Sequence, residues 1–271
     1  MTFITLTEQV GLGEPAPESW IPVAELPLCI LVGVTGVGKT SLCRSLLTHR
    51  SCRLLPERRV LTDRFILPTM GLLPEEGGYA RMDRLQRFEA TRAFRAEHPG
   101  GMGDVLSRVH LKDLGKELLL FDGLRGVEEV RYAAAHLPRA VFVVLIAPDW
   151  IRVQRLLSRQ DAFDAATEDP EDPETLPFET LCSQEQKQAL LHFCQVQGID
   201  RGQMAEKMRI VIKERENYDQ EGTQRFLQKT IPEQTMVIDS SRFSQEAIGP
   251  LVWTRLHDLG AAGMGNGPWK P

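Results

Sequence analysis

The residues that decide the fold are Gly33-Val34-Thr35-Gly36-Val37-Gly38-Lys39-Thr40-Ser41. They match the pattern G-x-x-x-x-G-K-[ST], between an apolar run at 28–32 and a stretch at 39–48 that favours a helix. In this pattern the glycines let the backbone turn, so that several N–H groups point at one cluster of phosphate oxygens. The positive end of the helix dipole adds to that attraction. The stretch therefore predicts a phosphate-binding loop (P-loop) in its strand–loop–helix setting.

Individual residues of the loop have expected roles. Lys39 is expected to reach the β- and γ-phosphates of ATP, and the Thr40 hydroxyl to ligate Mg²⁺. The alternative is a glycine-rich turn that matches by chance, which the strand and helix on either side disfavour. The loop alone does not say whether the γ-phosphate is transferred, hydrolysed or sensed. The predicted nucleotide-binding positions are Gly33, Thr35, Gly36, Val37, Gly38, Lys39, Thr40 and Ser41.

The composition argues against several classes of function. A net charge of −5 over 271 residues makes a nucleic-acid partner unlikely, because such proteins usually present a strong positive field. No apolar run has the length that a bilayer requires, and the first residues lack the features of a secretory signal. The five cysteines form no C-x-x-C pair, which favours reduced thiols. We therefore expect a cytoplasmic protein with no membrane partner.

Buried strands alternate with helical stretches along the chain. The apolar runs 28–32, 117–121, 140–146 and 236–238 predict parallel strands that are covered on both faces, and 58–62 predicts a further short strand. Such alternation is typical of a parallel sheet between two layers of helices. We expect an α/β fold of the P-loop NTPase type, a three-layer α/β/α arrangement with a mainly parallel five-stranded sheet and a helical lid or insertion.

Asp122 ends one of these apolar runs. A carboxylate at the C-terminal tip of a parallel strand lies where open α/β sheets place ligands, and it can support Mg²⁺ or orient an acceptor. The alternative is an aspartate that caps the next helix. The residue after Asp122 is Gly123 rather than glutamate, which disfavours steady hydrolysis of ATP. The chain also contains no N-K-x-D, T-K-x-D or L-S-G-G-Q stretch, which disfavours a switch GTPase and a transporter ATPase.

Arg152, Arg155 and Arg159 follow the run at 140–146 with spacings of three and four residues. On a helix they share one face, and clustered arginines neutralise the charge that develops during phosphoryl transfer. The alternative is a solvated helix face whose ion pairs contribute little. With the P-loop upstream we favour a lid, and we assign Lys39, Asp122 and these three arginines as candidate catalytic residues.

Three further segments resemble P-loop kinases related to archaeal adenylate kinase and dephospho-CoA kinase, within the wider nucleoside monophosphate kinase group. Residues 122–130 resemble their D-G-[IL]-R-x-x-x-E-[VI] segment, 147–159 their [SA]-P-x-x-x-R-x-x-R-[LI]-x-x-R segment, and 95–100 their acceptor-side piece. Residues 237–241 are similar to the final strand and loop that touch adenine in nucleoside monophosphate kinases.

The resemblance implies roles for particular residues. Arg64, Arg95 and Arg125 would contact the phosphate of the acceptor, and the arginines at 152, 155 and 159 would form a lid over the ATP phosphates. Asp122 would lie between donor and acceptor and, with Thr40, would support the metal. The cofactors implied are ATP and Mg²⁺.

The composition along the chain also suggests a division into parts. The expected parts are an irregular N-terminal arm at 1–26, a P-loop kinase core at 27–160, an acidic loop and helical insertion in the lid region at 161–205, the remainder of the core at 206–259, and a flexible tail at 260–271.

These observations lead to one favoured hypothesis and two alternatives. The favoured one is a phosphotransferase that moves the γ-phosphate of ATP to a small phosphorylated acceptor, nucleoside monophosphate-like by default. The first alternative is a nucleotide-gated ATPase or regulatory protein that docks a protein partner through 161–205. The second, weaker one is a kinase acting on nucleic-acid ends. The acceptor, the pathway and the oligomeric state are left open by the sequence.

Overall fold

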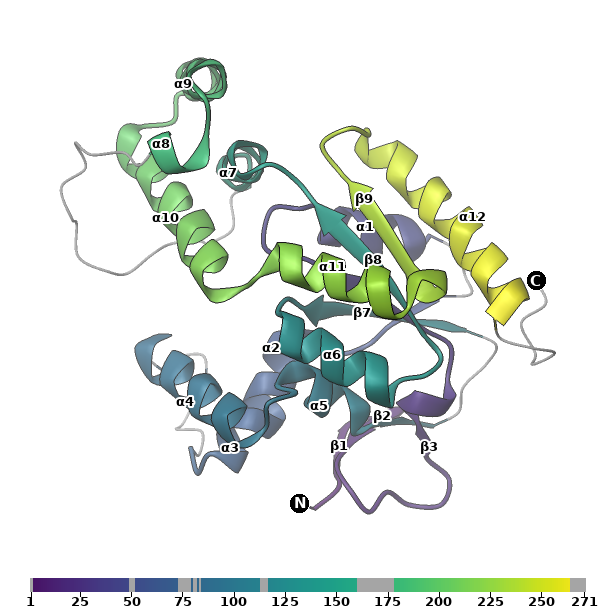
Figure 1. Ribbon diagram of the computed structural model, residues 1–271. Coiled ribbons are helices and arrows are strands. Elements are labelled where there is room, and N and C mark those ends of the chain that lie inside the picture. The colour runs from purple at the N-terminus through teal and green to yellow at the C-terminus, as the bar shows by residue number, and fades with distance from the viewer. Residues whose placement is uncertain are drawn as a thin grey trace.

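A five-stranded parallel sheet forms the centre of the molecule. The computed structural model describes residues 2–48, 52–72, 79, 82, 84–112, 117–159 and 178–263. The strand order is β5-β7-β4-β8-β9, and each neighbouring pair is parallel (Figure 1). The bounds are β4 Leu28–Val32, β5 Cys52–Leu54, β7 Leu118–Leu124, β8 Ala140–Ile146 and β9 Thr235–Asp239. The expected α/β fold with a five-stranded parallel sheet is confirmed.

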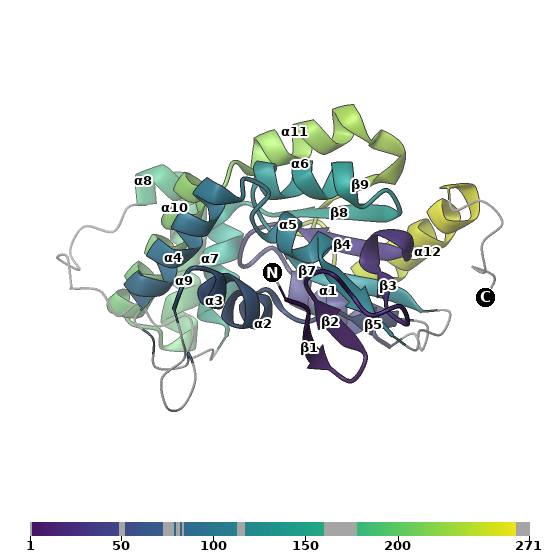
Figure 2. The ribbon, with the colours of Figure 1, turned by 90° about the horizontal axis from the view of Figure 1, so that it is seen from below.

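Helices cover both faces of this sheet, and its central strands are accordingly apolar on both sides. In β4, Ile30 and Val32 belong to one hydrophobic cluster, whereas Cys29 and Leu31 belong to another. The first cluster packs under α6 (Val127–His136) and α11 (Gln220–Thr230), and the second under α1 (Lys39–Leu46) and α12 (Gln245–Gly263). Figures 1 and 2 show these two helical layers on opposite faces of the sheet. The continuous apolar runs of the sequence reflect this two-sided burial.

The N-terminal segment differs from the expected irregular arm. It contains β1 (Ile4–Thr7), β2 (Val10–Leu12), β3 (Ile21–Pro22) and the 3₁₀ turn η1 (Val23–Glu25). These strands form a second, antiparallel sheet with β6 (Val109–Leu111), in the order β1-β2-β6-β3. The prediction was wrong because each strand is too short to show a period, and because β6 lies far along the sequence from the other three strands.

The segment after β5 is helical rather than extended. The strand expected at 58–62 is instead α2 (Arg58–Leu61) followed by the π-helix η2 (Thr62–Ile66), α3 (Leu67–Thr69) and, further on, α4 (Arg84–Glu97). Leu61 and Thr62 are buried in succession and Val60 is exposed, so burial does not alternate as a strand requires. The short helix α5 (Met102–Ser107) packs against α6.

A group of helices after β8 has a hydrophobic core of its own. It comprises α7 (Asp149–Leu157), α8 (Phe178–Leu181), α9 (Gln184–Gln197) and α10 (Arg201–Asn217), whose shared cluster includes Leu156, Leu190 and Met208. Ser183 and Asp200 start α9 and α10 with complete capping boxes. Residues 161–177 of the expected insertion, together with residue 160, lie outside the described residues.

The C-terminal part completes the main sheet. The 3₁₀ turn η5 (Pro232–Gln234) leads into β9, and α12 follows it to Gly263. The first residues of the expected tail at 260–271 are therefore helical, and 264–271 lie outside the described residues. Across the described ranges, no helix combines the length and the apolar character needed to span a bilayer.

Candidate nucleotide and phosphate site

The loop between β4 and α1 has the backbone of a phosphate cradle. Gly36 has φ +85°, and a Cβ atom there would lie 3.0–3.1 Å from Arg152, so a side chain is disfavoured for two reasons. Gly38 is the N-cap of α1 and supplies no side-chain acceptor to the first turn of the helix. The N–H groups of that turn therefore have no side-chain cap, as an anion site at a helix N-terminus requires.

Lys39 and Asp122 face each other beside the loop. The Lys39 Nζ atom donates to the Val34 carbonyl at 3.1 Å and lies 3.6 Å from Asp122 Oδ1. Burial lowers the pKa of Lys39 to about 8, although the Asp122 carboxylate opposes this effect. Burial likewise raises the pKa of Asp122, against the influence of Lys39 and Arg125. Burial therefore disfavours the charged form of each group, even beside the other.

The same carboxylate provides a test for Mg²⁺. Asp122 Oδ1 is buried and has no hydrogen-bond partner in the described structure, and Thr40 is exposed at the start of α1. Mg²⁺ is usually held by one or two protein oxygens together with substrate phosphates and water. The unsatisfied Oδ1 atom of Asp122 and the exposed hydroxyl of Thr40 fit that requirement. The described side chains contain no group of three or more His, Cys, Asp or Glu that could hold a metal by themselves.

The predicted arginine row begins under the loop rather than in solvent. Arg152 is fully buried, and its guanidinium donates to the Thr35 carbonyl at 2.9 Å, to Asp149 at 2.8 Å and to Glu214 at 2.7 Å. Such a set of partners satisfies a buried charge. The alternative that the arginine row is a solvated helix face is therefore wrong for Arg152.

The second arginine of the row joins the P-loop to the end of the sheet. Arg155 donates to the Gly36 carbonyl at 3.1 Å and to the Ser240 hydroxyl and carbonyl at 2.8 Å each. Ser240 in turn donates to the Val37 carbonyl at 2.7 Å. Burial and the nearby charge of Arg159 lower the pKa of Arg155. Arg159 itself is half-buried just after α7.

The three arginines predicted for the acceptor lie in different settings. Arg125 follows β7, and its Nη1 atom donates to Glu214 at 2.9 Å. Arg95 on α4 lies beside Gly101 and Glu129. A Cβ atom on Gly101 would be 3.3 Å from the Cγ atom of Arg95 and 3.3 Å from that of Glu129. Arg64 is exposed on η2. The structure thus brings Arg125 to the P-loop, whereas Arg95 lies beside α6.

An ion pair between the partly buried Arg58 and the buried Glu129, which the sequence did not reveal, supports the loop after Asp122. Arg58 binds both carboxylate oxygens of Glu129, at 2.6 and 2.8 Å, and donates to the Gly123 carbonyl at 2.7 Å. Glu129 also accepts from the Arg125 backbone N–H at 3.1 Å. Burial alone would raise the pKa of Glu129, but the Arg58 guanidinium brings it below its usual value. The pair therefore fixes the backbone on both sides of Leu124.

Glu214 is the second residue that sequence reasoning missed. It lies on α10 and accepts four hydrogen bonds, from the N–H and hydroxyl of Thr35, from Arg125 and from Arg152. In the sequence it stands within Lys213-Glu214-Arg215-Glu216, a run of alternating charge that gives no sign of which carboxylate is buried.

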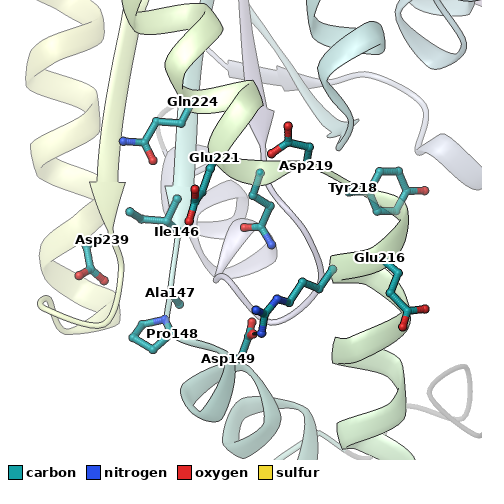
Figure 3. Close-up of a pocket in the computed structure, with 12 residues that line it drawn as sticks. Ile146, Ala147, Pro148, Asp149, Glu216, Tyr218, Asp219, Glu221, Gln224 and Asp239 are labelled. Carbon is teal, nitrogen blue, oxygen red and sulfur yellow. Dashed lines mark hydrogen bonds and ion pairs between the residues drawn. The ribbon is translucent and has the colours of Figure 1, made fainter. Parts of the chain in front are cut away.

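A separate cavity of about 700 Å³ opens on the other side of Asp149. Figure 3 shows side chains around it from the end of β8, the start of α7, the α10–α11 junction and the end of β9. Its lining includes the carboxylates of Asp149, Glu216, Asp219, Glu221 and Asp239. So many carboxylates disfavour a phosphate group, which distinguishes this cavity from the P-loop site.

Comparisons with known proteins give only distant structural likenesses. No protein-family model and no curated protein matches the chain. Among solved structures, it resembles a sugar kinase from Janibacter sp. HTCC2649 (13% identity, TM-score 0.38, covering 88% of this chain and 97% of that one). It also resembles a gluconokinase from Sinorhizobium meliloti 1021 (12%, 0.42, 88% and 95%) and a sulfotransferase from Alicyclobacillus acidocaldarius (15%, 0.39, 87% and 79%). At these values the fold assignment rests on the strand order and P-loop of this chain.

Proposed function

We propose that this protein is an ATP-dependent phosphotransferase that moves the γ-phosphate of ATP to a small phosphorylated acceptor, nucleoside monophosphate-like by default. The observation that carries the proposal is the facing pair of Lys39 and Asp122, 3.6 Å apart beside an uncapped helix N-terminus. Bound phosphates would add negative charge beside Lys39, and Mg²⁺ would add positive charge beside Asp122.

Different residues around the loop would have different roles in such a reaction. The P-loop N–H groups and Lys39 would hold the β- and γ-phosphates, and Thr40 and Asp122 would hold Mg²⁺, which neutralises phosphate charge. Arg125 would meet the acceptor, and Arg155 with Ser240 would border the base. An acceptor oxygen would form the new P–O bond while the bond from the γ-phosphorus to the bridging oxygen breaks and ADP leaves. Catalysis would come from positioning and charge stabilisation.

The most direct genetic test replaces Lys39. Lys39→Ala should abolish phosphoryl transfer, a loss of at least about a hundredfold, while the circular dichroism spectrum and the unfolding midpoint remain close to those of the wild type. Lys229→Ala is the matched control, because Lys229 is an exposed lysine near the end of α11. Wild-type activity in Lys39→Ala would contradict the assignment.

One observation keeps the nucleotide-gated regulator as a second candidate. Glu214 joins the P-loop to α10, which belongs to the helical group with its own hydrophobic core. A change at the loop on nucleotide binding could therefore reach the surface of that group. An acceptor screen with labelled ATP separates the two candidates. Label on a small molecule supports the phosphotransferase, whereas phosphate release that only a protein partner stimulates supports the regulator.

A further inference from the structure

The Glu214 carboxylate is bound as an anionic ligand would be. Its Oε1 atom accepts from the Thr35 hydroxyl at 2.5 Å and from Arg125 at 2.9 Å. Its Oε2 atom accepts from the Thr35 N–H at 2.9 Å and from Arg152 at 2.7 Å. Two guanidinium groups, a hydroxyl and a P-loop N–H thus converge on one small anion, and this is the donor set that binds phosphate oxygens in proteins.

The surroundings of Glu214 are positive without it. Arg152 retains a second partner, Asp149, whereas Arg125 pairs with Glu214 and also lies over the Tyr218 ring. The charge of Glu214 also acts on Lys39: burial lowers the lysine's pKa, and Glu214 is among the groups that oppose this effect. The carboxylate therefore lies within electrostatic reach of the residue that would hold the β- and γ-phosphates.

A phosphate group and the Glu214 carboxylate compete for these donors. A terminal phosphate carries more negative charge than a carboxylate and offers three oxygens to the same four donors. The two anions would repel each other at contact distance, because like charges in a partly buried site interact strongly. Both cannot occupy the cradle together.

Resting on the function proposed above, we propose that Glu214 is a built-in stand-in for a terminal phosphate of the substrates. It fills the cradle of Thr35, Arg125 and Arg152 when no substrate is bound, and a substrate phosphate must displace it. Glu214 thereby sets how tightly that phosphate binds and keeps the two arginines oriented before binding.

The chain provides a way for Glu214 to withdraw. Glu214 lies in the last turn of α10, which ends at Asn217. Tyr218 follows in an extended conformation (φ −134°, ψ 112°), and α11 begins after Asp219. Figure 1 shows the sharp change of direction between the two helices at this point. Because α10 packs in the cluster of the helical group and α11 packs on the sheet, withdrawal of Glu214 would require a change only at the junction between the two helices.

The test compares ligand affinities in three chains by isothermal titration calorimetry at fixed salt. The chains are the wild type, Glu214→Gln and the control Glu216→Gln, whose carboxylate is exposed on the same helix. The probes are ADP, the non-hydrolysable analogue AMP-PNP, and inorganic phosphate added to the ADP-bound protein. Glutamine keeps the size of the side chain and one acceptor oxygen but removes the charge.

The proposal predicts that Glu214→Gln binds at least one terminal phosphate about tenfold or more tightly than the wild type and Glu216→Gln, with ADP affinity nearly unchanged. If Glu214→Gln binds AMP-PNP more tightly, the γ-phosphate of ATP occupies the cradle. If it binds inorganic phosphate more tightly, the phosphate of the acceptor occupies the cradle. Unchanged or weaker binding of both overturns the proposal. If Glu214→Gln does not fold, Glu214→Asp, which withdraws the charge by one methylene, should shift the same affinity in the same direction.

The two proposals fail in different ways. If the wild type binds neither ADP nor AMP-PNP, the phosphotransferase assignment is wrong. If it binds ADP normally but neither terminal phosphate responds to Glu214, only the stand-in role is wrong.

Discussion

At the scale of single residues, the fold shifts the pKa of Lys39, the lysine of the P-loop. Burial lowers its pKa from 10.5 to about 8. Because the folded value lies below the unfolded one, the buried charge destabilises the fold fully below about pH 8, and this cost is relieved as the pH rises from 8 to 10.5. A bound phosphate would stabilise the charged form and raise the pKa again.

Nucleotide binding should therefore take up a proton at mildly alkaline pH. We expect an uptake of about half a proton per ATP near pH 8 and almost none near pH 6.5, because Lys39 is already charged there. Calorimetry in buffers with different ionisation enthalpies measures this number. Lys39→Arg is the control, since a guanidinium stays charged and the uptake should vanish. Equal uptake in the wild type and in Lys39→Arg would show that another group titrates.

The sequence was informative about this residue and its loop, but not about the partners of the arginines. The spacing of the P-loop motif is local, so it is visible in nine consecutive residues. The buried state of Arg152 depends on Glu214, which lies 62 residues further along the chain. No local pattern distinguishes such a carboxylate from its exposed neighbours, because only the tertiary fold brings the pair together.

At the scale of elements, the turn from β4 into α1 depends on the absence of a side chain at Gly36. This glycine combines a positive φ with close approach to Arg152 on α7. Gly71 has a similar φ of +77° but nothing within 4 Å of the position of its missing Cβ atom. The two glycines therefore separate the effect of backbone conformation from the effect of contact.

Gly36→Ala should destabilise the protein more than Gly71→Ala does. We expect about 1–2 kcal/mol for Gly71→Ala from backbone strain alone, and a clearly larger loss for Gly36→Ala, where α7 must also move. Urea unfolding measures both, and ATP binding should weaken in Gly36→Ala only. Equal losses of stability would mean that the contact between the loop and α7 contributes little.

The ion pair between α2 and α6 is a second contact between elements with a measurable effect. Glu129→Gln leaves the partly buried Arg58 without its carboxylate partner and should lower the free energy of unfolding by up to about 3–5 kcal/mol. Glu128→Gln is the control, because Glu128 is exposed on the same helix, and its loss should stay below about 1 kcal/mol.

The pH dependence of this pair has a definite sign. The folded pKa of Glu129 lies below the ordinary value of 4.5, so its contribution is present above that pH and is lost as the pH falls through the folded value. The difference in stability between the wild type and Glu129→Gln should therefore shrink on acidification. A difference that stays constant down to strongly acidic pH would contradict the ionic account.

At the scale of the whole molecule, the sheet and the helical group have separate hydrophobic cores. The sheet carries one cluster on each face, the larger of which contains Met102, and α7–α10 form a separate cluster around Met208. The sheet was predictable because continuous apolar runs identify buried parallel strands. The antiparallel sheet at the N-terminus was not: β1 and β2 pair locally but are very short, and β2 and β3 are joined only through β6, about 100 residues away in the sequence.

The helical group should open as a unit. Met208→Ala removes a fully buried side chain from its core and should speed hydrogen exchange throughout α7–α10, with little change in β4 and β8. Met102→Ala, in the larger core, should instead speed exchange in the sheet and its helices. The same protection pattern in both variants would mean that the molecule unfolds as one body.

The central claim is phosphoryl transfer, and the most direct measurement is a screen of small acceptors with γ-labelled ATP and Mg²⁺. The wild-type chain should move the label to a small phosphorylated acceptor, starting with the nucleoside monophosphates, and Lys39→Ala should not. Label found only as free phosphate with every acceptor, or equal transfer by Lys39→Ala, would contradict the account.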